Sequence, residues 1–462
     1  MSVFSALFDK NARCFEQVFS VQDTTSSEMQ RAIRGWFALY FEGGAPKEED
    51  DCQRLPVVIV NKLTKAVFSE YEADVKTQGA KADFVRKLLD CVDRAKKSIM
   101  QQALVGGECF IKPILTAQGL GVSVIRRDCF IPLERDGTGA VTSVGTSEET
   151  QAAGRYYTLL ERRTVDEAGT LTIESKLFES VDKNTLGVEV PLAKLDQYAA
   201  LQPVLELPGM YSLGMALVKT PLMNCVDGSQ DGVSVYAPAV GLIRNINRNE
   251  RLLDREFENG ASRILVSADM LESSGDGQKR LTNDVFEGID DDPDNIGITI
   301  FSPALREASY LARKQEYLRN VESAIGLKRG ILSEVEAAER TATEITSSEG
   351  DYNLTVIDFQ TMWADALKSF LTICDRLGQH YKLCDSSKFD PETDLVIDWG
   401  DGVLFNRDKV WQEYQTMVAS GMLKPELALA WYFNLPHETE KDLQKIRTNY
   451  MPEMEALVGG DA

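Results

Sequence analysis

Residues 231–260 read DGVSVYAPAVGLIRNINRNERLLDREFENG, and this stretch decides the fold. When the residues are plotted at about 100° per position, four large apolar side chains share one face: Leu242, Ile246, Leu253 and Phe257. This period predicts an amphipathic helix over 236–258, which ends at Gly260.

The charges of this helix are segregated. Four arginines form a stripe almost opposite the apolar face: Arg244, Arg248, Arg251 and Arg255. Three acidic residues form a flank beside the stripe: Glu250, Asp254 and Glu258. Like charges four residues apart destabilise an isolated helix by roughly a few tenths of a kcal/mol per pair. The stripes therefore favour a neighbouring surface of complementary charge, and a solvated helix with incidental patterning is the alternative interpretation.

A second helix is predicted over 304–326, from apolar residues spaced seven, three and four apart: Leu311, Leu318, Val321 and Ile325. Between the helices, residues 259–303 predict a small β-rich insert with strands at 263–266 and 296–301. The acidic run 290–295 inside it is predicted to be a solvated loop, because Pro293 and Phe301 break the pattern of a calcium loop. The two helices and the insert predict a stalk with a knob.

The rest of the chain predicts an α+β fold. Residues 1–105 show mainly helical periods, and 108–220 show period-two strands, including a hairpin turn at 166–169. After a break at 326–330 the sequence predicts a long helix over 341–383 with a kink or break at Gly350. A strand at 395–399, two short helices at 408–420 and 424–433 and a charged tail complete the prediction.

The composition is strongly acidic, with 72 Asp and Glu against 50 Lys and Arg, a net charge of −22. Proteins that grip DNA gather basic residues to displace phosphate counterions. The acidity therefore reflects either solubility or a surface past which DNA slides without being held. No apolar run is long enough for a membrane span, and the N-terminal run ends too early for a signal peptide. We expect a cytoplasmic protein whose eight cysteines are mostly buried thiols.

Residues that carry chemistry are sparse. The two histidines, His380 and His437, lack a second ligand at metal-binding spacing, and no phosphate-binding or nucleophile motif occurs. We therefore expect no catalytic residues, no cofactor and no metal, and so no enzyme. A metal-dependent nuclease built on Asp398 and Asp401 is the remote alternative, but acids beside glycines are more often turn formers.

Three short motifs follow one another along the chain. They are Asp231–Tyr236 before the first stalk helix, Glu339–Ile345 before the long helix, and Ile397–Asp401 followed by Asn406–Asp408. With these motifs the chain resembles the portal proteins of long-tailed bacteriophages. The resemblance implies an α+β portal fold with a helical and antiparallel-β wing, a two-helix stem, a small β-rich clip and a helical crown.

The resemblance also implies a map of the chain: wing 1–235, first stem helix 236–258, clip 259–303, second stem helix 304–326, tunnel loop 327–340, long wing helix and closing strand 341–405, and crown 406–462. The tunnel loop would place five charged residues near the DNA channel: Lys328, Arg329, Glu334, Glu336 and Glu339.

The implied protein is a homo-oligomeric ring, usually a dodecamer, at one capsid vertex of the virion, assembled in the host cytoplasm. Double-stranded DNA would pass through it without sequence specificity during packaging and ejection. The implied partners are the terminase large subunit, the head–tail connector or adaptor, and the major capsid and scaffolding proteins, with no membrane.

A ring subunit needs complementary sides rather than an active site. We therefore expect the arginine stripe of one stem to face Glu250, Asp254 and Glu258 of the next, so that charge reversal at Arg248 and Arg251 weakens assembly. The alternative to a portal is another structural or adaptor protein of the virion without a DNA channel.

Overall fold

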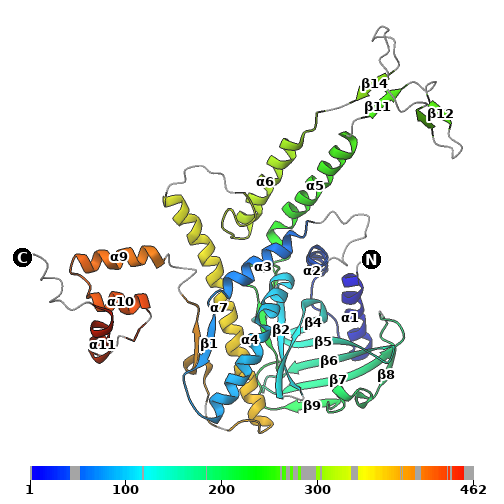
Figure 1. Ribbon diagram of the computed structural model, residues 1–462. Coiled ribbons are helices and arrows are strands. Elements are labelled where there is room, and N and C mark those ends of the chain that lie inside the picture. The colour runs from blue at the N-terminus through cyan, green and yellow to red at the C-terminus, as the bar shows by residue number, and fades with distance from the viewer. Residues whose placement is uncertain are drawn as a thin grey trace, which may run out of the picture. The chain divides into compact units, whose positions relative to one another are not determined.

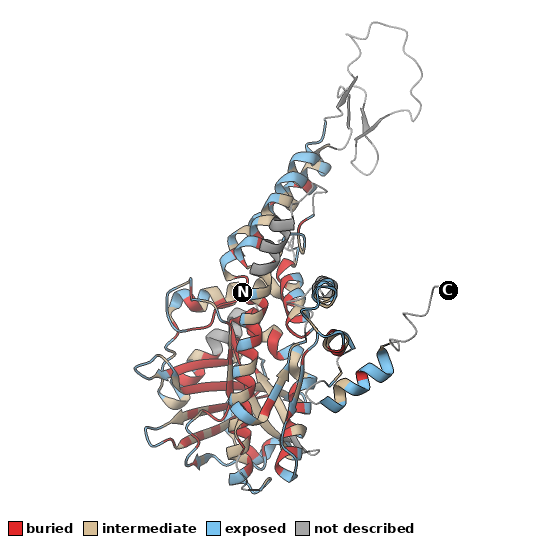
Figure 2. Cartoon of the chain, turned by 90° about the vertical axis from the view of Figure 1, so that its left-hand side faces the viewer, coloured by how far each residue is buried: buried red, intermediate tan, exposed pale blue. Residues whose placement is uncertain are grey.

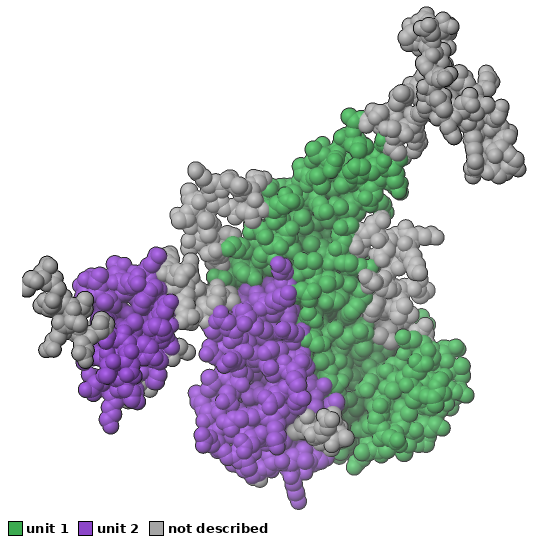
Figure 3. All heavy atoms as spheres, in the orientation of Figure 1, with its two compact units in different colours: residues 1–61, 98–112, 123–355 green, residues 62–97, 113–122, 356–462 purple. Residues whose placement is uncertain are grey.

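The structure, a computed structural model, combines helices and strands in an α+β fold. It describes residues 3–41, 53–116, 119–183, 185–260, 263–266, 271–273, 279–281, 298–301, 304–334, 342–385, 387, 389–400, 407–433, 435–436 and 440–451. Two compact units are distinguished in Figure 3. Unit 1 comprises residues 1–61, 98–112 and 123–355, and unit 2 comprises residues 62–97, 113–122 and 356–462.

Unit 1 contains a six-stranded antiparallel sheet (Figure 1), in the order β4-β5-β6-β7-β8, with β9 also paired to β7. Its strands are β4 Phe130–Arg135, β5 Val141–Ala152, β6 Arg155–Val165, β7 Leu171–Ser180, β8 Val188–Val190 and β9 Val204–Leu207. The predicted turn between β6 and β7 is confirmed: the Asp166 N–H donates to the Thr170 carbonyl at 3.1 Å, and Gly169 has φ 79°. The strand β5 was not predicted.

Helix α1, Val3–Phe19, packs on this sheet. The fully buried Phe15 clusters with Ile131, Leu160 and Phe178 from three strands. A Cβ atom on Gly145 of β5 would lie 2.6 Å from the Phe15 ring, so the glycine makes room for the aromatic side chain. One core cluster of unit 1 thus lies between helix α1 and the antiparallel sheet.

Further elements complete the part of unit 1 outside the sheet. The Ser26 hydroxyl caps helix α2, Ser27–Tyr40, by accepting from the Met29 N–H at 3.1 Å. A second small sheet, whose strands β2 and β3 contribute residues to both units, has the order β10-β2-β3, with β10 Ala216–Lys219, β2 Glu108–Thr116 and β3 Gly119–Ile125. Short 3-10 turns occupy Arg127–Cys129, Leu192–Lys194, Asp196–Tyr198 and Ala237–Ala239.

Two helices of unit 1, α5 Val240–Gly260 and α6 Glu307–Ala324, lie side by side as a hairpin (Figure 1). Figure 2 shows exposed and half-buried residues along much of the pair. Between them, β11 Arg263–Val266 pairs with β14 Ile298–Phe301, and β12 Leu271–Ser273 pairs with β13 Lys279–Leu281. The predicted strands of the insert are therefore confirmed, whereas the acidic run 290–295 lies outside the described residues.

In unit 2, β1 Glu72–Val75 pairs antiparallel with β15 Leu395–Asp398. Three aromatic side chains pack together there: the Trp363 ring centroid lies 5.0 Å from that of Phe68 and 6.3 Å from that of Tyr71. Helices α3 Leu55–Val67, α4 Ala80–Gly106 and α7 Ala342–His380 contribute residues to both units, and α8 spans Pro391–Asp394. A kink or break was predicted at Gly350, and the break is wrong because α7 continues through this residue.

The C-terminal part of unit 2 contains α9 Arg407–Ala419, α10 Pro425–Phe433 and α11 Glu440–Tyr450. Contacts between aromatic rings join these helices. The ring centroids of Trp411 and Tyr432 are 4.4 Å apart, and those of Phe433 and Tyr450 are 5.3 Å apart. Two of the helices were predicted. The third, α11, occupies what was predicted to be only a charged tail.

Candidate functional site

The motif that precedes the hairpin, residues 231–236, is completely buried. The Val235 N–H and the Ser234 hydroxyl both donate to the Leu104 carbonyl, each at 3.0 Å. The Tyr236 hydroxyl donates to the Trp36 carbonyl at 2.9 Å. This motif therefore fastens the start of α5 to α2 and to the end of α4.

Two glycines make this attachment possible. Gly107 has φ 86°, and a Cβ atom on it would lie 2.3 Å from the Gly232 carbonyl oxygen. A Cβ atom on Gly232 would in turn lie 2.4 Å from the Gly107 oxygen. No side chain fits at such distances, so the two backbones touch only because both residues are glycine.

A buried cluster of charges surrounds the motif. The fully buried Arg127 places Nε 3.0 Å from Glu108 Oε1, and its second amino nitrogen lies 3.7 Å from Asp231 Oδ1. Arg135 approaches the same Asp231 oxygen at 2.5 Å. The Gly232 N–H donates to Glu108 Oε2 at 3.2 Å. Burial raises the pKa of Glu108, and Arg127 opposes that rise.

The apolar face predicted for α5 is buried in part. Ile243, Ile246 and Leu253 are buried, whereas Leu242 is half-buried and Phe257 is 45% exposed. Of the four residues that share the predicted apolar face, Leu242 and Phe257 are thus the less buried two. Asn249 is also buried, so the buried face of α5 includes a polar residue.

Polar contacts join the two helices along their length. Asn249 Nδ2 donates to the Tyr310 carbonyl at 3.1 Å, and Lys314 Nζ lies 3.1 Å from Glu250 Oε1. Arg306 donates to both carboxylate oxygens of Glu256, at 3.0 and 2.7 Å. This bidentate pair lowers the pKa of Glu256 through hydrogen bonds from Arg306.

The outer face of α5 carries the predicted arginine stripe. Arg244, Arg248 and Arg255 are exposed, and Arg251 is half-buried. Of the acidic flank, Asp254 and Glu258 are exposed, but Glu250 is engaged by Lys314 of the same chain. The stripe thus lies on one surface of the helix, and one of the three acids, Glu250, forms an ion pair with Lys314.

The segment after α6 was predicted to be a tunnel loop. Lys328 is half-buried, and Arg329 and Glu334 are exposed. Glu336 and Glu339 lie outside the described residues. The prediction missed Glu322, whose carboxylate is fully buried and accepts hydrogen bonds from residues 330, 332 and 333. Its place on the apolar face of α6, four residues after Leu318 and three before Ile325, distinguishes it in the sequence from exposed acids such as Glu316. Sequence reasoning also missed the Arg127–Glu108 pair, because its two members lie on different elements.

The remaining candidates offer no reactive arrangement within the described ranges. Asp398 Oδ1 accepts from the Gly400 N–H at 2.8 Å, as turn formers do, and Asp401 lies outside those ranges. In the same ranges no three His, Cys, Asp or Glu side chains converge as metal ligands, and no helix combines the length and apolarity of a membrane span.

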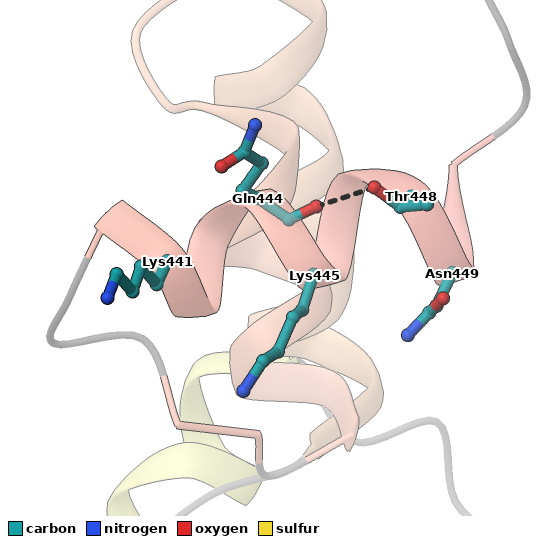
Figure 4. A pocket seen from close by; sticks show the side chains of 5 residues that line it. All are labelled: Lys441, Gln444, Lys445, Thr448 and Asn449. Carbon is teal, nitrogen blue, oxygen red and sulfur yellow. Dashed lines mark hydrogen bonds between the residues drawn. The ribbon is translucent and has the colours of Figure 1, made fainter.

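A shallow hollow on α11 encloses about 400 Å³ and is lined by Lys441, Gln444, Lys445, Thr448 and Asn449 (Figure 4). All five side chains come from one helix, and the Thr448 hydroxyl donates to the Gln444 carbonyl at 2.9 Å. Sites for small molecules usually combine apolar walls with polar groups from several elements. The hollow therefore gives no reason to assign a cofactor.

A comparison with known protein families identifies the family of this chain. The family described as phage portal protein, SPP1 Gp6-like, matches residues 58–450, and that range includes the buried motif, both hairpin helices and the long helix α7. No curated protein matches the chain. Because the family match covers far more than half of the sequence, this chain belongs to the SPP1 Gp6-like phage portal proteins, structural components of the virion capsid.

Proposed function

We propose that this portal protein is the subunit of a ring whose central channel carries double-stranded DNA into and out of the capsid. The stem would consist of α5 and α6, with the insert 259–303 as the clip and residues 327–340 as the tunnel loop. The wing would comprise residues 1–235 and 341–405, and the crown residues 406–462. The proposed ring is a dodecamer.

The arginine stripe of α5 carries this proposal. A chain of net charge −22 displays Arg244, Arg248 and Arg255 on one exposed helix face, opposite the face that packs on α6. Single-sign stripes on a helix are unfavourable unless another surface complements them. In a ring, the neighbouring stem would supply the acidic flank of Glu250, Asp254 and Glu258, and Glu250 also pairs with Lys314 of its own chain.

Several apolar side chains on the hairpin are also partly exposed. Leu252, Phe257, Leu305 and Leu311 are each between 38% and 45% exposed. Burial of these side chains against a neighbouring stem would add an apolar contribution to the charge complementarity.

The proposed partners follow from the channel role. The terminase large subunit and later the head–tail connector would dock on the clip, while the wing would contact the major capsid and scaffolding proteins during assembly in the host cytoplasm. The excess of acidic residues would limit DNA binding, so that duplex DNA slides through without sequence specificity.

The test is charge reversal on the stripe. We choose Arg248→Glu with Arg255→Glu, because both residues are exposed whereas Arg251 is half-buried. The double variant is expected to weaken subunit association by roughly tenfold or more, measured by mass in solution and by electron microscopy of the particles. Lys62→Glu with Lys65→Glu, on exposed positions of α3, makes the same change in net charge and is the matched control.

A charge swap tests complementarity directly. Adding Asp254→Arg to the double variant restores opposite charges across the proposed interface and should recover part of the lost association. Rings with a central hole support the proposal. Closed dimers or tetramers without a pore would contradict it and favour another structural or adaptor role in the virion.

A further inference from the structure

A buried carboxylate connects the last turns of α6 with the segment that follows. Glu322 is fully buried, and in the described ranges no Lys or Arg forms an ion pair with it. Its Oε1 accepts from three backbone N–H groups: Gly330 at 3.1 Å, Leu332 at 2.6 Å and Ser333 at 2.9 Å. Its Oε2 accepts from the Ser333 hydroxyl at 2.7 Å. Successive N–H groups that converge in this way form a binding site for an anion.

The backbone of the same residue ends the helix. Gly326 has φ 69°, and the Leu327 N–H donates to the Glu322 carbonyl at 2.9 Å, the bond that defines a Schellman motif. Glu322 therefore accepts bonds from residue 327 through its backbone and from residues 330–333 through its side chain. One residue thus holds both the turn that ends α6 and the segment 330–333 that follows it.

A second contact extends the attachment along α6. The Glu334 N–H donates to Gln315 Oε1 at 2.9 Å, two turns before Glu322. Residues 330–334 thus run back along the helix that they have just left. Gly330 adopts φ 95°, a conformation that suits glycine, at the point where this return begins.

We propose that Glu322 is a positioning residue that locks residues 330–333 to the end of α6, so that the stem helix and the first part of the tunnel loop move as one piece. The functional meaning of this lock rests on the proposed function, since only a DNA channel gives the loop its role. The lock itself is a property of the subunit and can be measured without a ring.

The test is hydrogen exchange of the amides of Gly330, Leu332 and Ser333 in the full chain. Glu322→Ala should accelerate their exchange by roughly tenfold or more, and trypsin should cleave faster after the exposed Arg329. Glu322→Gln retains an acceptor of similar shape and should recover part of the protection. Glu316→Ala removes an exposed acid from the same helix and should change neither measurement.

The melting temperature separates a local lock from general stability. A lock predicts faster exchange at the three amides with little change in the melting of the whole chain. If Glu322→Ala does not fold, Ser333→Ala decides, because it removes one donor and should accelerate exchange severalfold. Unchanged exchange at these amides in either folded variant would overturn the proposal. If these amides exchange slowly in the parent protein and faster in the Glu322 variant, but the protein forms no ring, the result would contradict only the proposed function.

Discussion

Replacing Arg127 by methionine should destabilise unit 1 more than most single changes in this chain. The side chain of Arg127 is completely buried, and the side chains of Glu108 and Asp231 are only 6% and 2% exposed. Methionine fills much of the same volume but leaves Glu108 without its cation, whereas Asp231 retains Arg135. Breaking a buried ion pair in this way costs about 3–5 kcal/mol.

The matched experiment removes both charges. In Arg127→Met with Glu108→Gln, the amide oxygen can still accept from the Gly232 N–H, and no uncompensated charge remains in the core. We expect the double variant to recover at least about 2 kcal/mol relative to the single one. Urea titrations give the free energies of unfolding, and hydrogen exchange assigns the transition to unit 1. A single variant within about 1 kcal/mol of the parent, or a double variant that is no better, would refute this reasoning.

The pH dependence of the stability difference between Arg127→Met and the parent gives an independent check. Burial raises the pKa of Glu108, and loss of Arg127 should raise it further. A carboxyl group whose pKa is higher in the folded state costs stability above its unfolded pKa, and this cost disappears as the pH falls below that value. The deficit of Arg127→Met relative to the parent should therefore shrink as the pH approaches 4.5.

Two further predictions concern other positions. Gly154 has φ 74° and open space around it, so Gly154→Ala should lower the free energy of unfolding by about 1–2 kcal/mol. Gly107→Ala adds a collision with the Gly232 backbone to a positive φ and should lower it clearly more. Thermal melting compares the two variants. Burial alone would raise the pKa of Glu161, but neighbouring cations, including Lys112 at 2.5 Å, lower it to about 2. This carboxylate therefore adds stability above its unfolded pKa of 4.5 that is lost as the pH falls toward 2, and Lys112→Met should reduce that loss in urea titrations at pH 7 and pH 3.

Periodicity predicted most long elements, because their burial is regular. The stem-like helices, the strands of the insert and the hairpin turn after β6 all follow local patterns. β5 was missed because its sequence, VTSVGTSEETQA, is mostly polar and contains Gly145. It is nevertheless a strand, since β4 and β6 supply hydrogen bonds on both of its edges. Tertiary pairing here overrides local propensity.

Other elements depended on contacts that no single stretch reveals. The sequence EADV of β1 has no strand signal, and its partner β15 lies more than three hundred positions further along the chain. Helix α11 did carry a signal, with Glu440 and Asp442 in its first turn and Arg447 in its last. For the candidate site, the arginine stripe was readable from spacing, but the locking role of Glu322 depends on a loop that returns to it.

The distribution of apolar contacts along the hairpin has a consequence for assembly. The buried apolar residues of α6, Leu318 and Val321, lie in its second half, and among the described side chains of α5 none after Leu253 is buried. Beyond these positions polar pairs such as Arg306–Glu256, whose side chains are 69% and 19% exposed, join the helices in place of a buried apolar core. An isolated subunit should therefore open and close the distal part of this hairpin readily. Completion of the rod would then be left to its neighbours, so that each subunit finishes folding as it is incorporated.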